Sequence, residues 1–186
     1  MIRILFVFLF LCTPMTATAE EWCKDSKTQP ISEMRIPFNT TWADAKKKLP
    51  TEYRGIATIK FDEDKQFALV SYRDSKKSIF DMHGYAFRAG HLHMATFSYS
   101  NQFQDKVGGI VEAFRAIASK LIERFGGEKA DDVSQEGGKV VAIWNSHPVH
   151  VELSAKDPNA VLLRFQCSPL ADHLSKKASE AVNMGF

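Results

Sequence analysis

The most regular hydrophobic pattern in the chain runs from Val107 to Phe125, where apolar residues recur every three or four positions with charged residues between them. This spacing places the apolar side chains on one face of a helix. We therefore expect a long amphipathic helix over about residues 105–125. The Gly126–Gly127 pair that follows is typical of a left-handed cap that ends a helix.

Two groups of strand-like segments flank this helix, four before it and three after it. Each is rich in β-branched and aromatic residues and is bounded by turn-forming residues. The expected strands before the helix are Gly55–Phe61, Gln66–Tyr72, Ile79–Phe87 and Leu92–Tyr99. Those after it are Lys139–Trp144, Val149–Ser154 and Ala160–Gln166, with Gly137–Gly138 interpreted as a turn.

Shorter helices are expected near both ends of the chain. One follows a cap at Thr40 or Thr41 and is stopped by Pro50, and the other spans Ala171–Val182. Because the strands are grouped between helices and do not alternate singly with them, the pattern predicts an α+β fold. Its mostly antiparallel sheet has about seven strands, packed by the long helix and the short N-terminal helix. The order of elements also suggests a doubled helix-then-strands unit.

The loop Arg88–His91 should join two neighbouring strands in a hairpin with Phe87 opposite Leu92. Side chains of directly paired residues lie on the same face of a sheet, so this register fixes the neighbours of the other residues in the hairpin. It places Tyr85 opposite Met94 and Met82 opposite Phe97.

The first 19 residues have the three parts of a secretory signal peptide. A short basic start at Arg3 is followed by an apolar run from Ile4 to Leu11 and by Ala17-Thr18-Ala19, which fits the small-x-small cleavage rule. We expect cleavage after Ala19, so that residues 20–186 form a single exported domain in the periplasm. The sequence contains no later stretch of transmembrane length, so no membrane span is expected after cleavage.

Cysteine usage agrees with export. Cys12 belongs to the leader, and the mature chain keeps Cys23 and Cys167, near its two ends. In an oxidising compartment two such cysteines most simply pair with each other. We therefore predict a structural disulfide between Cys23 and Cys167.

The composition and net charge of the chain argue against nucleic acid as its partner. The chain has 186 residues, of which 45% are hydrophobic and 25% charged, with a net charge of +2. These proportions are those of an ordinary globular protein. Arg3 of the leader supplies one of the positive charges, so the mature chain has no charge excess to hold a polyanion and nucleic-acid binding is not expected.

The sequence lacks the familiar enzyme signatures. It has no G-x-S-x-G elbow, P-loop, dinucleotide-binding fingerprint or H-E-x-x-H helix. The acidic pair Asp131-Asp132 lies in a polar stretch where solvation gives no reason for a raised pKa. We therefore expect a non-catalytic protein, with an enzyme that has no recognisable motif as a further alternative.

The histidines are the sharpest local feature. His91 and His93 alternate along an expected strand, and His147 and His150 flank a turn. Imidazole nitrogens are common ligands of copper and zinc, so these four residues form a candidate metal site. The predicted register places His91, His93 and Met82 on one face of the sheet, and His83 and Met94 on the other, so His147 or His150 would have to complete the site.

The sequence therefore favours an exported protein that binds another exported or envelope protein. An inhibitor, an immunity-type protein or an accessory factor of an envelope complex fits this description. Edge strands and the loops Arg88–His91 and Asn145–His150 are the expected contact surfaces. The alternative is a periplasmic copper- or zinc-binding protein that uses His91, His93 and His147 or His150. The sequence predicts no particular partner or oligomeric state.

Overall fold

The computed structural model describes residues 23, 32–73, 78–100, 109–145 and 148–183. The expected leader at residues 1–19 and His147 lie outside these residues. In chain order the elements are α1 (Trp42–Glu52), β1 (Ala57–Asp62), β2 (Phe67–Tyr72), β3 (Met82–Arg88), β4 (His91–Ser100), α2 (Ile110–Arg124), β5 (Asp132–Glu136), β6 (Lys139–Trp144), β7 (Val149–Asp157), β8 (Ala160–Cys167) and α3 (Ser168–Asn183).

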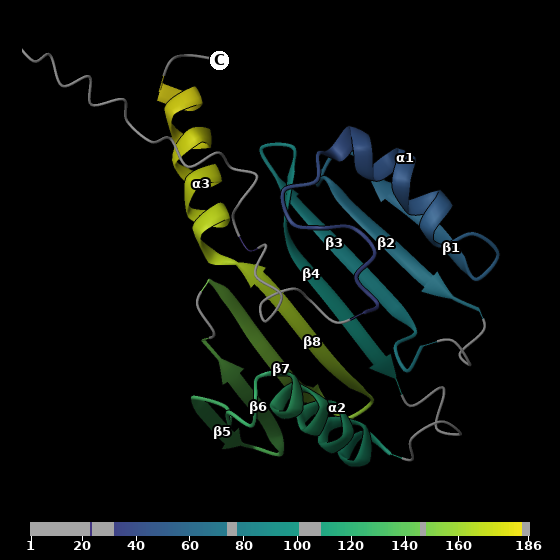
Figure 1. The fold of residues 1–186 in the computed structure, drawn as a ribbon, viewed down its shortest axis with the longest axis vertical. Helices are drawn as coiled ribbons and strands as arrows, with labels where there is room; N and C mark the ends of the chain where they lie inside the picture. The colour runs from purple at the N-terminus through teal and green to yellow at the C-terminus, as the bar shows by residue number, and fades with distance from the viewer. Residues whose placement is uncertain (1–22, 24–31, 74–77, 101–108, 146–147, 184–186) are drawn as a thin grey trace, which may run out of the picture.

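The strands form one eight-stranded antiparallel sheet in the order β1-β2-β3-β4-β8-β7-β6-β5 (Figure 1). The predicted α+β fold is confirmed. A helix followed by four strands occurs twice, and the two halves of the sheet meet where β4 pairs with β8. The strand order is therefore symmetric about this central pair, with β1 at one edge and β5 at the other.

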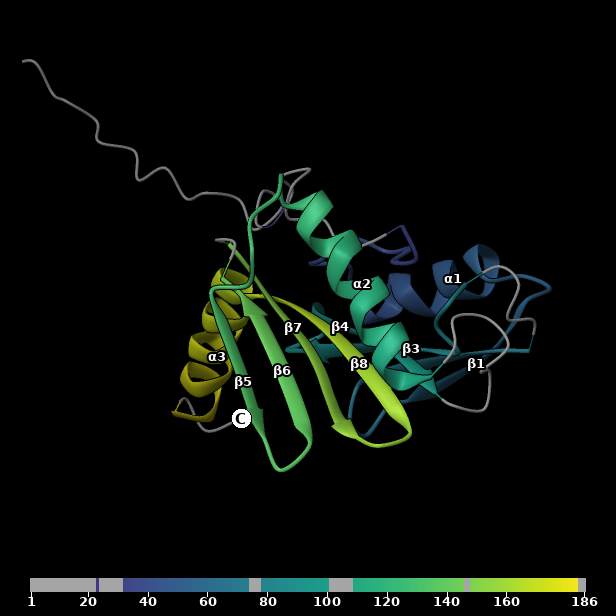
Figure 2. The same cartoon turned by 90° about the horizontal axis from the view of Figure 1, so that it is seen from below.

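Two helices lie on the same side of the sheet (Figure 2). α1 contacts β1, and α2 packs chiefly on β7 and β8. The third helix, α3, continues from the end of β8 and contacts β3, β4 and β8. None of the helices in the described part of the chain is long and apolar enough to cross a membrane.

The helix ends follow local sequence signals. Thr41 caps α1, because its side-chain oxygen accepts a hydrogen bond from the Asp44 backbone N–H at 3.1 Å. α2 ends before Gly126 and Gly127, whose φ angles of 72° and 91° confirm the predicted left-handed cap. The prediction that Pro50 stops α1 is wrong: Pro50 lies in the last turn, which the Tyr53 N–H closes by donating to the Leu49 carbonyl at 3.1 Å.

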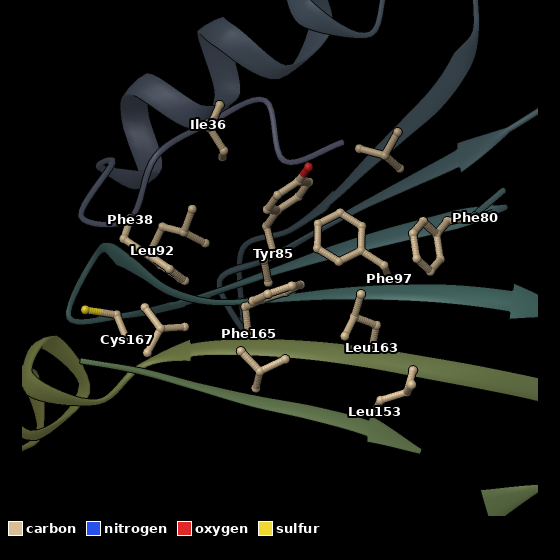
Figure 3. Close-up of a cluster of buried hydrophobic side chains, with 14 of the residues drawn as sticks. Ile36, Phe38, Phe80, Tyr85, Leu92, Phe97, Leu153, Leu163, Phe165 and Cys167 are labelled. Carbon is tan, nitrogen blue, oxygen red and sulfur yellow. The ribbon is translucent and has the colours of Figure 1, made fainter. Parts of the chain in front are cut away.

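The core lies between the sheet and the helices α1 and α2. Side chains from the central strands project into it with residues of the N-terminal segment, as Figure 3 shows for Ile36, Phe97 and Phe165. Trp144 is buried there, and Trp42 packs edge-on against Phe87 with a ring separation of 4.9 Å. This face of the sheet, which we call the helix-covered face, therefore supplies most of the apolar burial.

The predicted register of the β3–β4 hairpin is only partly correct. Phe87 does pair with Leu92, but a β-bulge follows, and His93 is the additional residue in β4. Beyond the bulge each partner is displaced by one position. Tyr85 therefore pairs with Ala95 and Met82 with Ser98, where Met94 and Phe97 were expected.

Candidate functional site

A row of paired residues crosses all eight strands on the helix-covered face. Each residue is the register partner of the next, so their side chains project to the same side of the sheet. His83 is the polar member of an otherwise apolar row. From edge to edge the row is Ile59, Val70, His83, Phe97, Leu163, Leu153, Ala142 and Val133.

His83 lies in a closed cluster of aromatic side chains. Its Nδ1 is 3.2 Å from the Tyr53 hydroxyl and 3.3 Å from the Tyr72 hydroxyl. The Tyr85 hydroxyl also contacts that of Tyr53, and the ring of Phe97 packs edge-on against the imidazole at a centroid separation of 4.6 Å. His83, Tyr53 and Tyr85 are fully buried, so the two tyrosines shield the imidazole from solvent.

The hydrogen-bond donors in this cluster can be assigned by counting protons. The Tyr53 hydroxyl is 2.7 Å from the Glu33 carbonyl, which can only accept, so Tyr53 donates to it. The Tyr53 oxygen is then left to accept from its other neighbours. We assign the His83 proton to Nδ1, which donates to Tyr53, because Nε2 has no hydrogen-bond partner in the described structure and an orphaned lone pair costs less than an orphaned N–H.

Burial changes the acid–base behaviour of the whole cluster. Desolvation, helped by the positive charge of Arg35, lowers the pKa of His83 to about 3. Desolvation also raises the pKa of Tyr53, Tyr72 and Tyr85 well above the ordinary value. All four side chains are therefore neutral at physiological pH, as expected for a hydrogen-bonded network that organises the core.

The four histidines of the predicted metal site occupy different surroundings. His91 Nδ1 lies 3.3 Å from the Asn39 carbonyl, and His150 Nδ1 lies 2.9 Å from the Asn145 side-chain oxygen. His93 is half-buried, and desolvation, together with the positive charge of Arg88, lowers its pKa. His147 falls outside the described residues.

The structure does not bring His150 next to His91 and His93. His150 pairs with Gln166, which in turn pairs with Met94, so His150 lies two strands from Met94. With about 4.8 Å between strands, this corresponds to about 10 Å. No group of three or more potential metal-ligating His, Cys, Asp or Glu side chains occurs among the described residues, and the four-histidine site stays a prediction.

The β-bulge also changes the predicted distribution of side chains between the two faces. Met82 and Met94 share a face, because Met94 pairs with Ala86, which is four positions, an even number, along β3 from Met82. His83 lies on the opposite, helix-covered face. The prediction that Met82 and Met94 point to opposite faces is therefore wrong, since it did not allow for the additional residue at His93.

The two cysteines form the predicted disulfide. Cys23 and Cys167 are bonded, with Cα atoms 6.0 Å apart, although 144 positions separate them in the sequence. Cys167 is the last residue of β8, so the bond anchors the N-terminal part of the chain to the centre of the sheet. Both residues are buried, as expected for a structural disulfide.

Among the residues that the structure describes, the two most exposed large apolar side chains lie at or near the β5 edge. Val133 in β5 and Val111 in α2 are 63% and 56% exposed. Between these elements is a groove of about 520 Å³. Its lining residues come from the start of α2 and from the β5–β8 part of the sheet, and they are Ile110, Val111, Phe114, Arg115, Gln135, Gly138, Val140, Ala155 and Pro158.

The two edges of the sheet are protected differently. At β1, α1 covers the edge through the contact of Trp42 with Phe61, at a ring separation of 5.5 Å, and Lys60 places a charge within the strand. At β5 every residue is exposed and the strand has no lysine. Edge lysines and covering helices are common means of blocking further strand pairing. The β5 edge is therefore the less protected of the two.

Sequence reasoning missed both β5 and the His83 cluster. The signal for β5 was the Gly137–Gly138 pair, whose φ angles of 56° and 76° suit a two-residue hairpin turn. For the cluster the alternation of His83, Tyr85 and Phe87 indicated a shared face, but nothing in the sequence placed Tyr53 beside it.

Comparison with known proteins adds little. No family model matches the chain, and no curated protein matches it. Among solved structures it is similar to a DUF4309 family protein, YjgB, from Bacillus subtilis subsp. subtilis str. 168. The match has 6% sequence identity and a TM-score of 0.31, and it covers 66% of this chain and 77% of the other. A likeness this distant carries no argument about fold or function.

Proposed function

We propose that this protein is an exported, non-catalytic binding protein that takes up an extended segment of a partner protein along the β5 edge. The observation that carries the proposal is the exposed edge strand next to an apolar groove. An added strand would gain main-chain hydrogen bonds from β5, and its alternate side chains would cover Val133 and enter the groove. The Cys23–Cys167 disulfide supports export, since such bonds persist in oxidising compartments.

Charge argues against a second copy of this chain as the occupant. In an antiparallel β5–β5 pair centred on Ser134, Asp132 of each copy would lie opposite Glu136 of the other. Like charges directly opposite each other destabilise a sheet. Lys139 lies opposite Glu136 within the β5–β6 hairpin, whereas Asp132 lies opposite Ile143. The acidic charge left for a partner is therefore at Asp132, and we expect the partner segment to carry a lysine or arginine there.

The test uses two short peptides and the mature, oxidised chain. One peptide, acetyl-Lys-Val-Thr-Val-Lys-amide, alternates apolar side chains between basic ends, and the other replaces both lysines with glutamate. We expect the lysine peptide to shift the backbone NMR signals of β5 and of Val111, and the glutamate peptide to bind several-fold more weakly. Equal binding of both peptides, or shifts confined to other surfaces, would overturn the proposal.

A variant in the edge strand β5 provides a second test of the proposal. Val133→Lys places a charge where an added strand would pack, and we expect it to weaken the lysine peptide about tenfold or more. Thr58→Lys, in the opposite edge strand β1, is the matched control and should leave binding unchanged. An unaltered affinity in Val133→Lys, with the fold intact by circular dichroism, would contradict binding at β5.

A further inference from the structure

A second pocket lies between α2 and the sheet and is separate from the β5 edge. It has a volume of about 210 Å³. An engineered apolar cavity of about 150 Å³ holds benzene, so this pocket has room for one ring with a short substituent. Its lining residues are Ser32, Glu33, Ile79, Phe80, Ile117, Lys120, Leu121, Arg124 and Leu163.

The floor of this pocket is apolar and fixed in place by the core. Ile117 and Leu121 are buried residues of α2, and Leu163 belongs to the row that crosses the helix-covered face. The Phe80 ring packs against Phe97 at a centroid separation of 5.5 Å. Because these side chains are already held by neighbours, a ligand that packs on them would lose little affinity to reorganisation.

The charged residues of the lining include more cations than carboxylates. Lys120 and Arg124 are four residues apart in α2, so their side chains lie on the same side of the helix. The Glu33 carboxylate lies near enough to Arg124 to favour its charged form, opposing the effect of burial, which lowers the pKa of Arg124. Among the described lining residues, Lys120 and Arg124 supply two positive charges and Glu33 one negative charge, which leaves one net positive charge.

We propose that this pocket binds a small carboxylate whose apolar body is about the size of one aromatic ring. The ring would pack on Ile117, Phe80 and Leu163, and the carboxylate would be held by Lys120 and Arg124. A neutral ligand would leave this positive charge without a counter-charge. A dianion would be repelled by Glu33, so one negative charge fits best.

The test compares three probes on the mature, oxidised chain by calorimetry and by NMR. Phenylacetate has both the ring and the charge, 2-phenylethanol has the ring alone, and acetate has the charge alone. We expect phenylacetate to bind at least tenfold more tightly than either of the others, with amide shifts at Ile117, Leu121 and Leu163. Equal affinity for 2-phenylethanol, no binding of phenylacetate, or shifts confined to other regions would overturn the proposal.

Variants separate this site from the β5 edge. Lys120→Gln removes an exposed cation from the rim and should weaken phenylacetate about tenfold, since a charge-assisted hydrogen bond contributes this much. Lys47→Gln, on the exposed side of α1, is the matched control for the loss of one charge. Val133→Lys should bind phenylacetate normally even if it fails to bind the lysine peptide. An unchanged affinity in Lys120→Gln contradicts the proposed site.

Discussion

At the scale of single residues, the main feature that the sequence did not predict is the buried imidazole of His83. The sequence drew attention to His91 and His93 because they alternate along a strand, yet the fully buried imidazole is that of His83. Alternation along β3 shows that His83 and Tyr85 share a face. Only the packing of α1 and of the Glu33 segment reveals that Tyr53 joins them, because that contact spans 30 positions in the sequence.

The lowered pKa of His83 predicts sensitivity to acid. Since the folded value is about 3 and the ordinary value is 6.5, the unfolded chain binds more protons between these limits, and stability falls as pH drops below 6.5. At pH 4.5 this contribution amounts to about 2–3 kcal/mol. Urea unfolding at pH 7 and pH 4.5 measures it, and His83→Phe, which cannot titrate, should lose correspondingly less stability over that interval.

The comparison is between the two pH values within each variant, because His83→Phe also removes the hydrogen bond to Tyr53, and this loss changes the stability of the variant at both pH values. His150→Gln, with His83 in place, is the matched control and should keep the full acid sensitivity due to His83. If His83→Phe and the parent chain lose the same stability between pH 7 and pH 4.5, the buried imidazole is not the origin of the effect.

At the scale of elements, hydrophobic periodicity predicted the helices and strands that bury a face. It placed α2 closely, because the apolar face of that helix packs on β7 and β8. It missed β5, because the segment Asp132–Glu136 is exposed throughout. A strand with no buried face does not need apolar and polar residues to alternate. The β3–β4 bulge was also invisible, because one additional residue leaves the apolar content of the strand unchanged.

The pairing of β3 with its neighbours depends on a glycine. A Cβ atom at Gly84 would lie 2.5 Å from Thr96 Oγ1 and 2.6 Å from Phe67 Cζ, both closer than real contacts allow. We expect Gly84→Ala to lower the free energy of unfolding by about 1–3 kcal/mol, because the side chains of Thr96 and Phe67, or the strands that carry them, must shift. Denaturant unfolding measures the loss.

Two further variants identify the cause. Thr96→Ala removes one of the clashing atoms, so combining it with Gly84→Ala should recover part of the loss and give a positive coupling in the double-mutant cycle. Gly109→Ala is the matched control, since its Cβ would meet only the flexible end of Glu112, at 3.1 Å, and should cost less than about 1 kcal/mol. Strict additivity of Gly84→Ala and Thr96→Ala would exclude the clash with Thr96 as a cause of the loss.

At the scale of the whole molecule, the order of elements predicted the doubled unit, and the sheet confirms it through a strand order symmetric about β4 and β8. What the order did not reveal is that the two units are unequal. The first covers its outer strand with α1, whereas the second has its helix over β7 and β8 and exposes β5. That inequality produces the groove on which the proposed binding rests.

The Cys23–Cys167 disulfide is the covalent link across this architecture. It joins a residue ahead of α1 to the last residue of β8, so it holds the N-terminal segment against the second unit. A loop of 144 positions is long, and closing it restricts the unfolded chain strongly.

We expect the double variant Cys23→Ser/Cys167→Ser to lose about 2–5 kcal/mol of unfolding free energy. Thermal unfolding of the oxidised parent, the reduced parent and the double variant tests this, and the last two should agree. Equal melting temperatures for the oxidised and reduced parent chains would mean that the packing of Ile36 and Phe38 alone holds the N-terminal segment in place.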